Sequence, residues 1–256
     1  MKLAKRIEID RWVLAVTGVV FPLYSLFWIY NNFEWPSLLL LLAVELVLAM
    51  SVTMFAHRAW AHKSWTPNRY VNILGLLLFT ISFVGASIGW VAVHREHHKH
   101  TDTDKDPHSP YYNSRMKIQF LSSLIKFKIE YAIDLIRSQE HLWFARNYWN
   151  INILLFLVLF LTSPALLSFW IACLGICVFR MHTINSLAHK TPLSNQTGSS
   201  NSFWLILVHL HNGEALHRNH HADPKSYRFS KHWYQVDPPA AIIELLALFK
   251  LAKINY

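Results

Sequence analysis

Charged residues and cysteines are scarce in this sequence. Asp, Glu, Lys and Arg make up 15% of its 256 residues, whereas hydrophobic residues make up 53%. This balance excludes an ordinary soluble domain and indicates a membrane protein. The two cysteines, Cys173 and Cys177, lie in an apolar run. They are expected to pack between helices, and their small number excludes a disulfide framework or an iron-sulfur centre.

Motifs for nucleic-acid binding and for built-in electron transfer are absent as well. The formal net charge is +9, but the Lys and Arg residues are spread between apolar segments and form no basic arm, so we expect no nucleic-acid partner. The sequence contains no GxGxxG fingerprint, no ferredoxin-like cysteine pattern and no haem-binding extension. The basic residues are typical of positive-inside bias and of attraction to anionic lipid headgroups.

Two long stretches of the chain contain no Lys or Arg. The first runs from Trp12 to His57 and is divided by a polar break at residues 31–36, and the second runs from Asn147 to Phe179 and is divided at Ser163. Each stretch has room for two membrane-spanning helices. We therefore predict an all-α membrane protein with four spans in two hairpins, at about residues 12–30, 36–56, 148–162 and 165–181. The flanking basic residues place both termini in the cytoplasm.

A fifth apolar segment, residues 70–93, carries no charged residue. If it crossed the bilayer, the histidines before it and after it would lie on opposite faces and could not share a site. We therefore predict that it is interfacial or buried and does not span. Glu45 lies in the middle of a predicted span, where an ionised carboxylate is costly, and is expected to face the interior of the bundle.

Histidine is abundant, with 16 residues, and three clusters follow apolar segments on the predicted cytosolic side. The second and third clusters use spacings of three and four residues, which bring imidazoles to one face of a helix. The first cluster has a spacing of five, so its helix must end or bend for both rings to converge. Asn185 and His189 add another pair with a spacing of four. The clusters are His57 and His62; His94, His97 and His98; and His217, His220 and His221.

The number of these histidines indicates more than one metal ion. Imidazole binds iron, zinc, copper and nickel, so the ligand type does not select the metal. A single zinc ion takes three or four protein ligands, and eight or nine histidines exceed that need. Because zinc has no redox chemistry, two redox-active iron ions beside apolar spans are the favoured interpretation, with an apolar substrate.

These motifs resemble those of the membrane fatty acid desaturases, a family that includes stearoyl-CoA desaturase and bacterial acyl-lipid relatives. The resemblance covers the chain from about Pro36 onward. It rests on the spacings HxxxxH, HxxHH and HxxHH, on the Asn-Ser-x-Ala-His stretch that ends at His189, and on two further segments. These segments are Thr101, Asp102, Asp106, Pro107, His108, Ser109 and Pro110 after the second box, and Trp233, Tyr234, Gln235, Val236 and Asp237 near the C-terminus.

The resemblance implies a ligand set and a cytosolic helical cap that carries it. Asn185 would hold a water molecule bound to the metal. Leu216 and Asp223 depart from the family pattern around the third box, but neither change removes a ligand. Carboxylates near the boxes are candidates to orient the ligating rings; for Glu96 and Glu214 a solvated loop charge is an equal alternative. The implied ligands are His57, His62, His94, His97, His98, His189, His217, His220 and His221, and the candidate carboxylates are Asp102, Asp106, Glu96 and Glu214.

The resemblance also implies an activity. The chain is expected to be a single integral-membrane domain, residues 1–256, that uses O2 and two iron ions to introduce a cis double bond, most commonly at Δ9, into a saturated acyl chain. The substrate would be an acyl lipid, acyl-CoA or acyl-ACP. Electrons would come from a separate ferredoxin or cytochrome b5-like donor. The short tails favour a bacterial inner membrane, with the metal site facing the cytoplasm.

Two other functions fit parts of the pattern. Another histidine-box oxidase, such as an alkane, carotenoid or sterol hydroxylase, would use similar ligands, but the Asp-Pro-His-Ser-Pro segment favours a desaturase. A metal transporter would place its histidines inside the spans, whereas these boxes lie at span ends. The product distinguishes a hydroxylase from a desaturase, because hydroxylation adds an oxygen atom to the substrate and desaturation does not.

Overall fold

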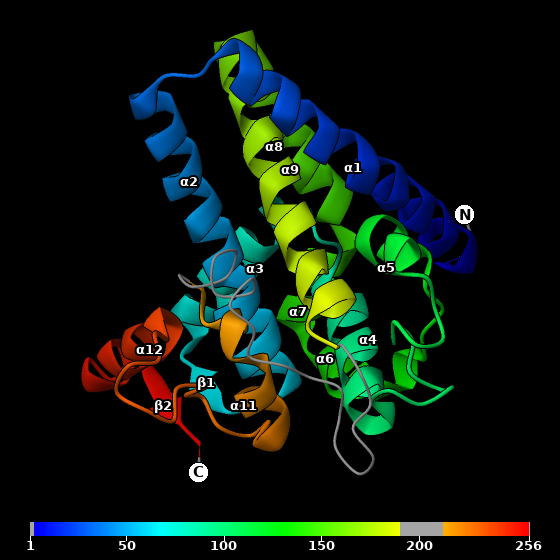
Figure 1. Ribbon diagram of the computed structural model, residues 1–256, viewed down its shortest axis with the longest axis vertical. Coiled ribbons are helices and arrows are strands. Elements are labelled where there is room, and N and C mark those ends of the chain that lie inside the picture. The colour runs from blue at the N-terminus through cyan, green and yellow to red at the C-terminus, as the bar shows by residue number, and fades with distance from the viewer. Residues whose placement is uncertain (1–2, 190–211, 256) are drawn as a thin grey trace.

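The computed structural model describes residues 3–189 and 212–255, and it is predominantly helical (Figure 1). The longest elements are α1, α2, α8 and α9, and most of the others are short. In chain order the elements are α1 (Leu3–Asn31), α2 (Trp35–Met50), η1 (Ser51–Ala61), β1 (Trp65–Pro67), α3 (Arg69–Ile81), α4 (Ser87–His100), α5 (Arg115–Leu121), η2 (Ser122–Leu124), η3 (Ile129–Ala132), α6 (Ile133–Arg137), α7 (Gln139–Arg146), α8 (Tyr148–Thr162), α9 (Pro164–Leu187), η5 (Glu214–Leu216), α11 (His217–Ala222), α12 (Pro238–Leu248) and β2 (Ala252–Ile254).

Three helices in the described part of the chain are long and apolar enough to cross a membrane. They are Asp10–Asn31, Trp35–Ala61 and Pro164–Leu187, and the second of them is α2 continued without a break by η1. The helix α8 reaches such a length only together with α7, from which it is bent by 55°. By length and composition, the described part of the chain thus supplies three candidate spans, or four if the bent pair counts as one; that each of them crosses a membrane stays a prediction.

The packing of the long helices differs from two separate hairpins. The helix α1 runs along α9, and it diverges from α2 beyond their connecting turn (Figure 1). Close contact is possible because Gly175 has no side chain: a Cβ there would lie 2.2 Å from the backbone oxygen of Phe21. Ser25 reinforces the contact, since its hydroxyl donates to the carbonyl of Ala172 at 2.8 Å. Small residues let apolar helices approach closely in this way.

A buried ion pair joins α2 to α9 within the bundle. Glu45 is 1% exposed, and its carboxylate accepts from the guanidinium of Arg180. The expectation that Glu45 faces the bundle interior is therefore confirmed. Two opposite charges that leave water together remain compatible with an apolar surrounding, whereas either charge alone would be costly.

The segment 70–93 is divided into the helices α3 and α4. The turn between them contains two residues with positive φ, Phe83 at 65° and Gly85 at 104°. Phe83 is buried and packs against Phe21 and Phe156, which secures its strained backbone. Neither helix is long enough to count among the candidate spans. The placement of this segment at the membrane interface remains a prediction.

Short elements gather around the end of the bundle where α2 continues into η1, in the lower half of Figure 1. They include a feature that the sequence did not predict, a two-stranded antiparallel sheet in which Trp65 pairs with Ile254. A buried ion pair between Arg58 and Asp237, 2.8 Å apart, ties η1 to the turn before α12. The C-terminal part of the chain is thereby fastened beside the first histidine box.

Candidate metal centre

The π-helix η1 explains how the first histidine box converges. Its turns are closed by hydrogen bonds between residues five apart, and the N–H of His62 donates to the carbonyl of His57 at 3.1 Å. The wider turn brings residues five apart to the same face, and the helix ends at His62. The two ring centroids lie 5.2 Å apart. A π-helical segment is rare and often marks a functional site.

The other histidines come from three helices. The helix α4 carries the second box, α11 carries the third, and His189 follows the end of α9. All nine predicted ligands converge, and they form two groups in which one ligand atom of each residue lies within 4.8 Å of the others. Group A is His57, His62, His94, His98 and His220, and group B is His97, His189, His217 and His221.

Within each group the Nε2 atoms face one another. In group A, the Nε2–Nε2 distance is 2.8 Å between His62 and His94, and the Nε2 of His220 lies 2.9 Å from that of His57 and 2.9 Å from that of His98.

In group B, the Nε2 of His217 lies 2.9 Å from that of His189 and 3.1 Å from that of His221. The Nε2 of His221 in turn lies 3.4 Å from that of His97.

The Nε2–Nε2 distances in both groups can be compared with those of a metal site. Two imidazoles at right angles on one ion, with bonds of about 2.1 Å, have nitrogens about 3 Å apart. The spacing in both groups fits this geometry, so the donor set suits two ions.

Three carboxylates orient rings in the two groups. Nδ1 of His57 donates to Glu214 at 2.8 Å, that of His97 to Asp106 at 2.8 Å, and that of His189 to Asp102 at 3.1 Å. A carboxylate only accepts, so Nδ1 of each ring carries the proton and Nε2 keeps its lone pair. The lone pairs consequently point into the groups. Each ring is held in the tautomer that a metal requires.

Glu96 does not share this arrangement. Its carboxylate accepts the backbone N–H of Lys128 at 2.9 Å, and it therefore supports the loop before η3. Glu96 precedes His97 on α4 and so faces a different side of the helix. The expectation that it orients a ligating ring is not supported by its contacts.

Burial favours the neutral form of seven of the imidazoles. Together with neighbouring imidazoles, of which His57 acts most strongly, burial lowers the pKa of His98 to about 3. The same causes lower the pKa values of His62, His94, His97, His217, His220 and His221. Neutral rings offer the lone pairs that metal binding needs. Burial raises the pKa of Asp106 to about 6, although the N–H groups of Asp102 and His108 favour its ionised form.

His108 is a neighbour of the site that the ligand prediction left out. It is buried, its ring stacks on that of His97 at 4.2 Å between centroids, and it forms a third potential metal-binding group with His97 and Asp106. Its place in the Asp-Pro-His-Ser-Pro segment was the available signal. The ring packs against the face of His97 and so restricts its rotation.

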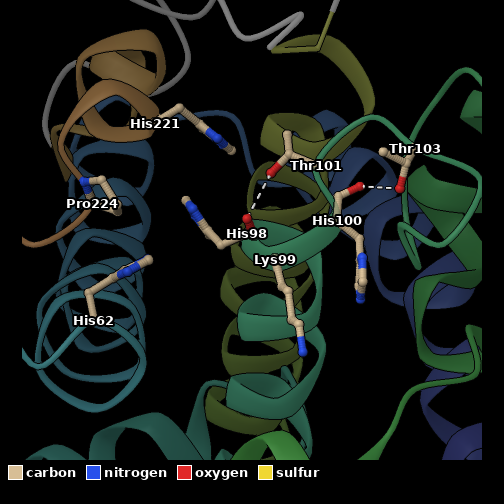
Figure 2. Close-up of a pocket in the computed structure, with 8 residues that line it drawn as sticks. All are labelled: His62, His98, Lys99, His100, Thr101, Thr103, His221 and Pro224. Carbon is tan, nitrogen blue, oxygen red and sulfur yellow. Dashed lines mark hydrogen bonds between the residues drawn. The ribbon is translucent and has the colours of Figure 1, made fainter.

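Two hollows adjoin the histidines. A narrow cavity of about 50 Å³ lies between η1, α4 and α9. Its lining is apolar on one part and polar on the other, where His57, His94, His217, Asn185 and Glu214 border it. Asn185 thus lines a cavity that is also lined by histidines of both groups. A second, open pocket of about 360 Å³ is lined by His62, His98 and His221 on the outer side, with Lys99 beside them (Figure 2).

Comparison with known proteins identifies the family. The sequence profile described as fatty acid desaturase matches residues 33–248. The chain belongs to the fatty acid desaturase family. Among its curated relatives, delta-9 acyl-lipid desaturase 1 of Arabidopsis thaliana is 32% identical over 86% of this chain and 75% of the relative. The sn-2 palmitoyl-lipid 9-desaturase of Nostoc sp. (strain 36) is 28% identical over 95% of this chain and 89% of the relative.

Membership settles the class of enzyme. The expected resemblance is confirmed, and the chain is an oxidoreductase of the fatty acid desaturase type. The histidine clusters agree with the histidine boxes that the spacing indicated. Apolar helices of spanning length agree with an integral membrane protein.

Proposed function

We propose that this chain is an O2-dependent di-iron desaturase that introduces a cis double bond at Δ9 of a saturated acyl chain. The observation that carries the proposal is the convergence of nine buried or half-buried imidazoles into two groups with metal-like spacing. Group A would hold one iron ion and group B the other. Asn185 would hold a water molecule bound to the metal, and its place in the lining of the cavity beside His57, His94 and His217 supports this.

Iron and the residues of the chain would make different contributions to the reaction. When bound, iron supplies the O2-dependent oxidising chemistry that removing hydrogen from an unactivated methylene requires. The residues of the chain position the substrate and exclude water. Val52, Val84, Trp90, Met181 and Ile184 line the narrow cavity beside His57 and His94. The few carbons of an acyl chain that a cavity of about 50 Å³ admits would lie beside the histidine groups.

The relatives support the regiospecificity. Their names assign Δ9 desaturation of acyl lipids to them, and we extend that activity to this chain with an acyl lipid as the favoured substrate over acyl-CoA and acyl-ACP. A separate ferredoxin or cytochrome b5-like protein would supply electrons. Electrons could enter through the open pocket of Figure 2, because His62, His98 and His221 are half-buried there and are reached from the surface.

The proposed topology follows from the same elements. We propose a single domain with four spans, both termini and the metal site in the cytoplasm, and a bacterial inner membrane as its location. The three unbroken candidate spans and the bent α7–α8 pair supply the spans, and the short elements around η1 supply the cap. Both histidine groups lie at the η1 end of the bundle.

The test is the fatty acid composition of a host that makes the protein together with an electron donor. Gas chromatography with mass spectrometry should find a new cis-Δ9 monounsaturated chain with wild type and none with His98→Ala. His232→Ala is the matched control, because His232 is exposed and stacks on Tyr234; it should keep activity. Hydroxylated chains in place of alkenes would assign the site to another histidine-box oxidase.

A further inference from the structure

The C-terminal segment exposes an unusual set of apolar side chains. Trp233 is 96% exposed, Leu248 75% and Phe249 65%. We call the whole set the C-terminal apolar face: Trp233, Tyr234, Val236, Ile242, Leu245, Leu248, Phe249 and Leu251. So many exposed large apolar side chains within one short segment favour an interaction site over an ordinary solvated surface.

The helix α12 contributes two apolar sides to this region. Pro239, Ala240 and Ile243 are buried against the rest of the protein, whereas Leu245 and Leu248 point outward. A helix that is apolar on nearly all sides is expected to be covered on all sides. Protein covers the inner side of α12, and the outer side lacks an equivalent cover in the described part of the chain.

The position of α12 indicates what lies against its outer side. The helix packs on η1, which forms the inner end of the candidate span Trp35–Ala61, and on β2. In Figure 1, α12 lies beside the end of this span and runs across its direction. The exposed side of α12 is consequently at the depth where the span leaves the apolar layer.

The polar surroundings of the face fit a lipid surface. Trp and Tyr concentrate at membrane–water interfaces, and the face carries one of each, Trp233 and Tyr234, both exposed. Lys231, Lys250 and Lys253 are exposed around the apolar face, where they can reach anionic headgroups.

We propose that the C-terminal apolar face is a monotopic membrane anchor, seated in the headgroup layer of the bilayer that the long helices cross. The proposal rests on the proposed membrane topology. Such an anchor would also connect the bilayer to the metal site. The strand β2 pairs with β1, which begins three residues after His62, and the side chain of Asn255 donates to the carbonyl of Lys63 at 2.8 Å. The anchor therefore holds the first histidine box at a set height above the lipid.

The test uses a nitroxide label on the full chain in vesicles of phosphatidylethanolamine and phosphatidylglycerol. The label is placed at Leu248→Cys in a background of Cys173→Ala and Cys177→Ala, which removes the two native thiols. Val20→Cys on the exposed side of α1 is the lipid reference, and Lys105→Cys is the water reference. Collision with O2 and with a polar nickel chelate is measured at each position.

If the face is a membrane anchor, the label at Leu248 should collide more often with O2 and less often with the nickel chelate than the label at Lys105. Both collision rates should shift toward those measured at Val20. Nickel access equal to that at Lys105 would overturn the proposal. Low access to both reagents with spin–spin coupling between labels would also overturn it, because a second copy would then cover the face. Retention of metal by each variant shows that it is folded, and water-like values at Val20 would instead reject the topology.

Discussion

Replacing Glu214 by alanine tests how the site holds its ligands. The change removes the acceptor for the Nδ1–H of His57, 2.8 Å away in a buried setting. A hydrogen bond to a charged partner contributes about 1.5–3 kcal/mol, and about 1.4 kcal/mol corresponds to a factor of ten. Iron in group A should therefore bind about 10- to 150-fold more weakly, in the range known for carboxylates behind metal ligands.

Glu214→Gln keeps an oxygen acceptor for the ring but loses the charge. Because a neutral hydrogen bond is about half as strong as a charge-assisted one, its loss of affinity should lie between that of alanine and wild type. Each protein is purified anaerobically with iron and challenged with increasing chelator, and the retained iron is measured by mass spectrometry.

Glu96→Gln is the matched control, since Glu96 is also buried but accepts from the backbone of Lys128. It should retain iron as wild type does. The reasoning is refuted if Glu214→Ala resists the chelator as well as wild type, or if Glu96→Gln loses as much iron as Glu214→Ala.

Three further predictions concern the bundle and the metal-free site. Glu45→Ala should destabilise the protein by about 3–5 kcal/mol, because it leaves the buried charge of Arg180 without its partner carboxylate. Thermal unfolding in detergent measures the change, and a loss of stability below about 1 kcal/mol would contradict the prediction. Gly175→Leu should lower the yield of folded protein by separating α1 from α9, whereas Gly89→Ala, whose Cβ meets only Phe127 at 3.5 Å, should not; size-exclusion profiles compare them. For the metal-stripped protein, His98 has a folded pKa of about 3 and an ordinary value of 6.5. As pH falls, the imidazole of His98 therefore takes up its proton in the unfolded state first. The free energy of unfolding should consequently fall by about 1.4 kcal/mol per pH unit between pH 6.5 and pH 3. Denaturation midpoints that do not change over this range would contradict that.

The histidines that converge could be predicted from the sequence because the information for their placement is largely local. Spacings of three and four place His94, His97 and His98 on adjoining parts of one helix surface, and the third box repeats the pattern. Long runs without Lys or Arg likewise predicted the long apolar helices. Both signals depend on neighbours in the chain rather than on contacts between distant segments.

Other features depend on distant contacts and were not predictable. The five-residue spacing of His57 and His62 required a bent or ended helix, but the π-helix that satisfies it is surrounded by buried side chains from several elements. The pairing of β1 with β2 joins segments near opposite ends of the chain. The contact of Glu96 with the backbone of Lys128 requires the loop before η3 to fold against α4.

The most direct test of the two-group metal centre is the number of iron ions per chain. Wild type, purified anaerobically with ferrous iron, should bind two, and His62→Ala combined with His94→Ala should bind one because only group A loses ligands. His189→Ala combined with His217→Ala should likewise bind one, through group A. A single ion in wild type, or loss of both ions from either double variant with the fold intact, would contradict the assignment of two separate histidine groups to two ions.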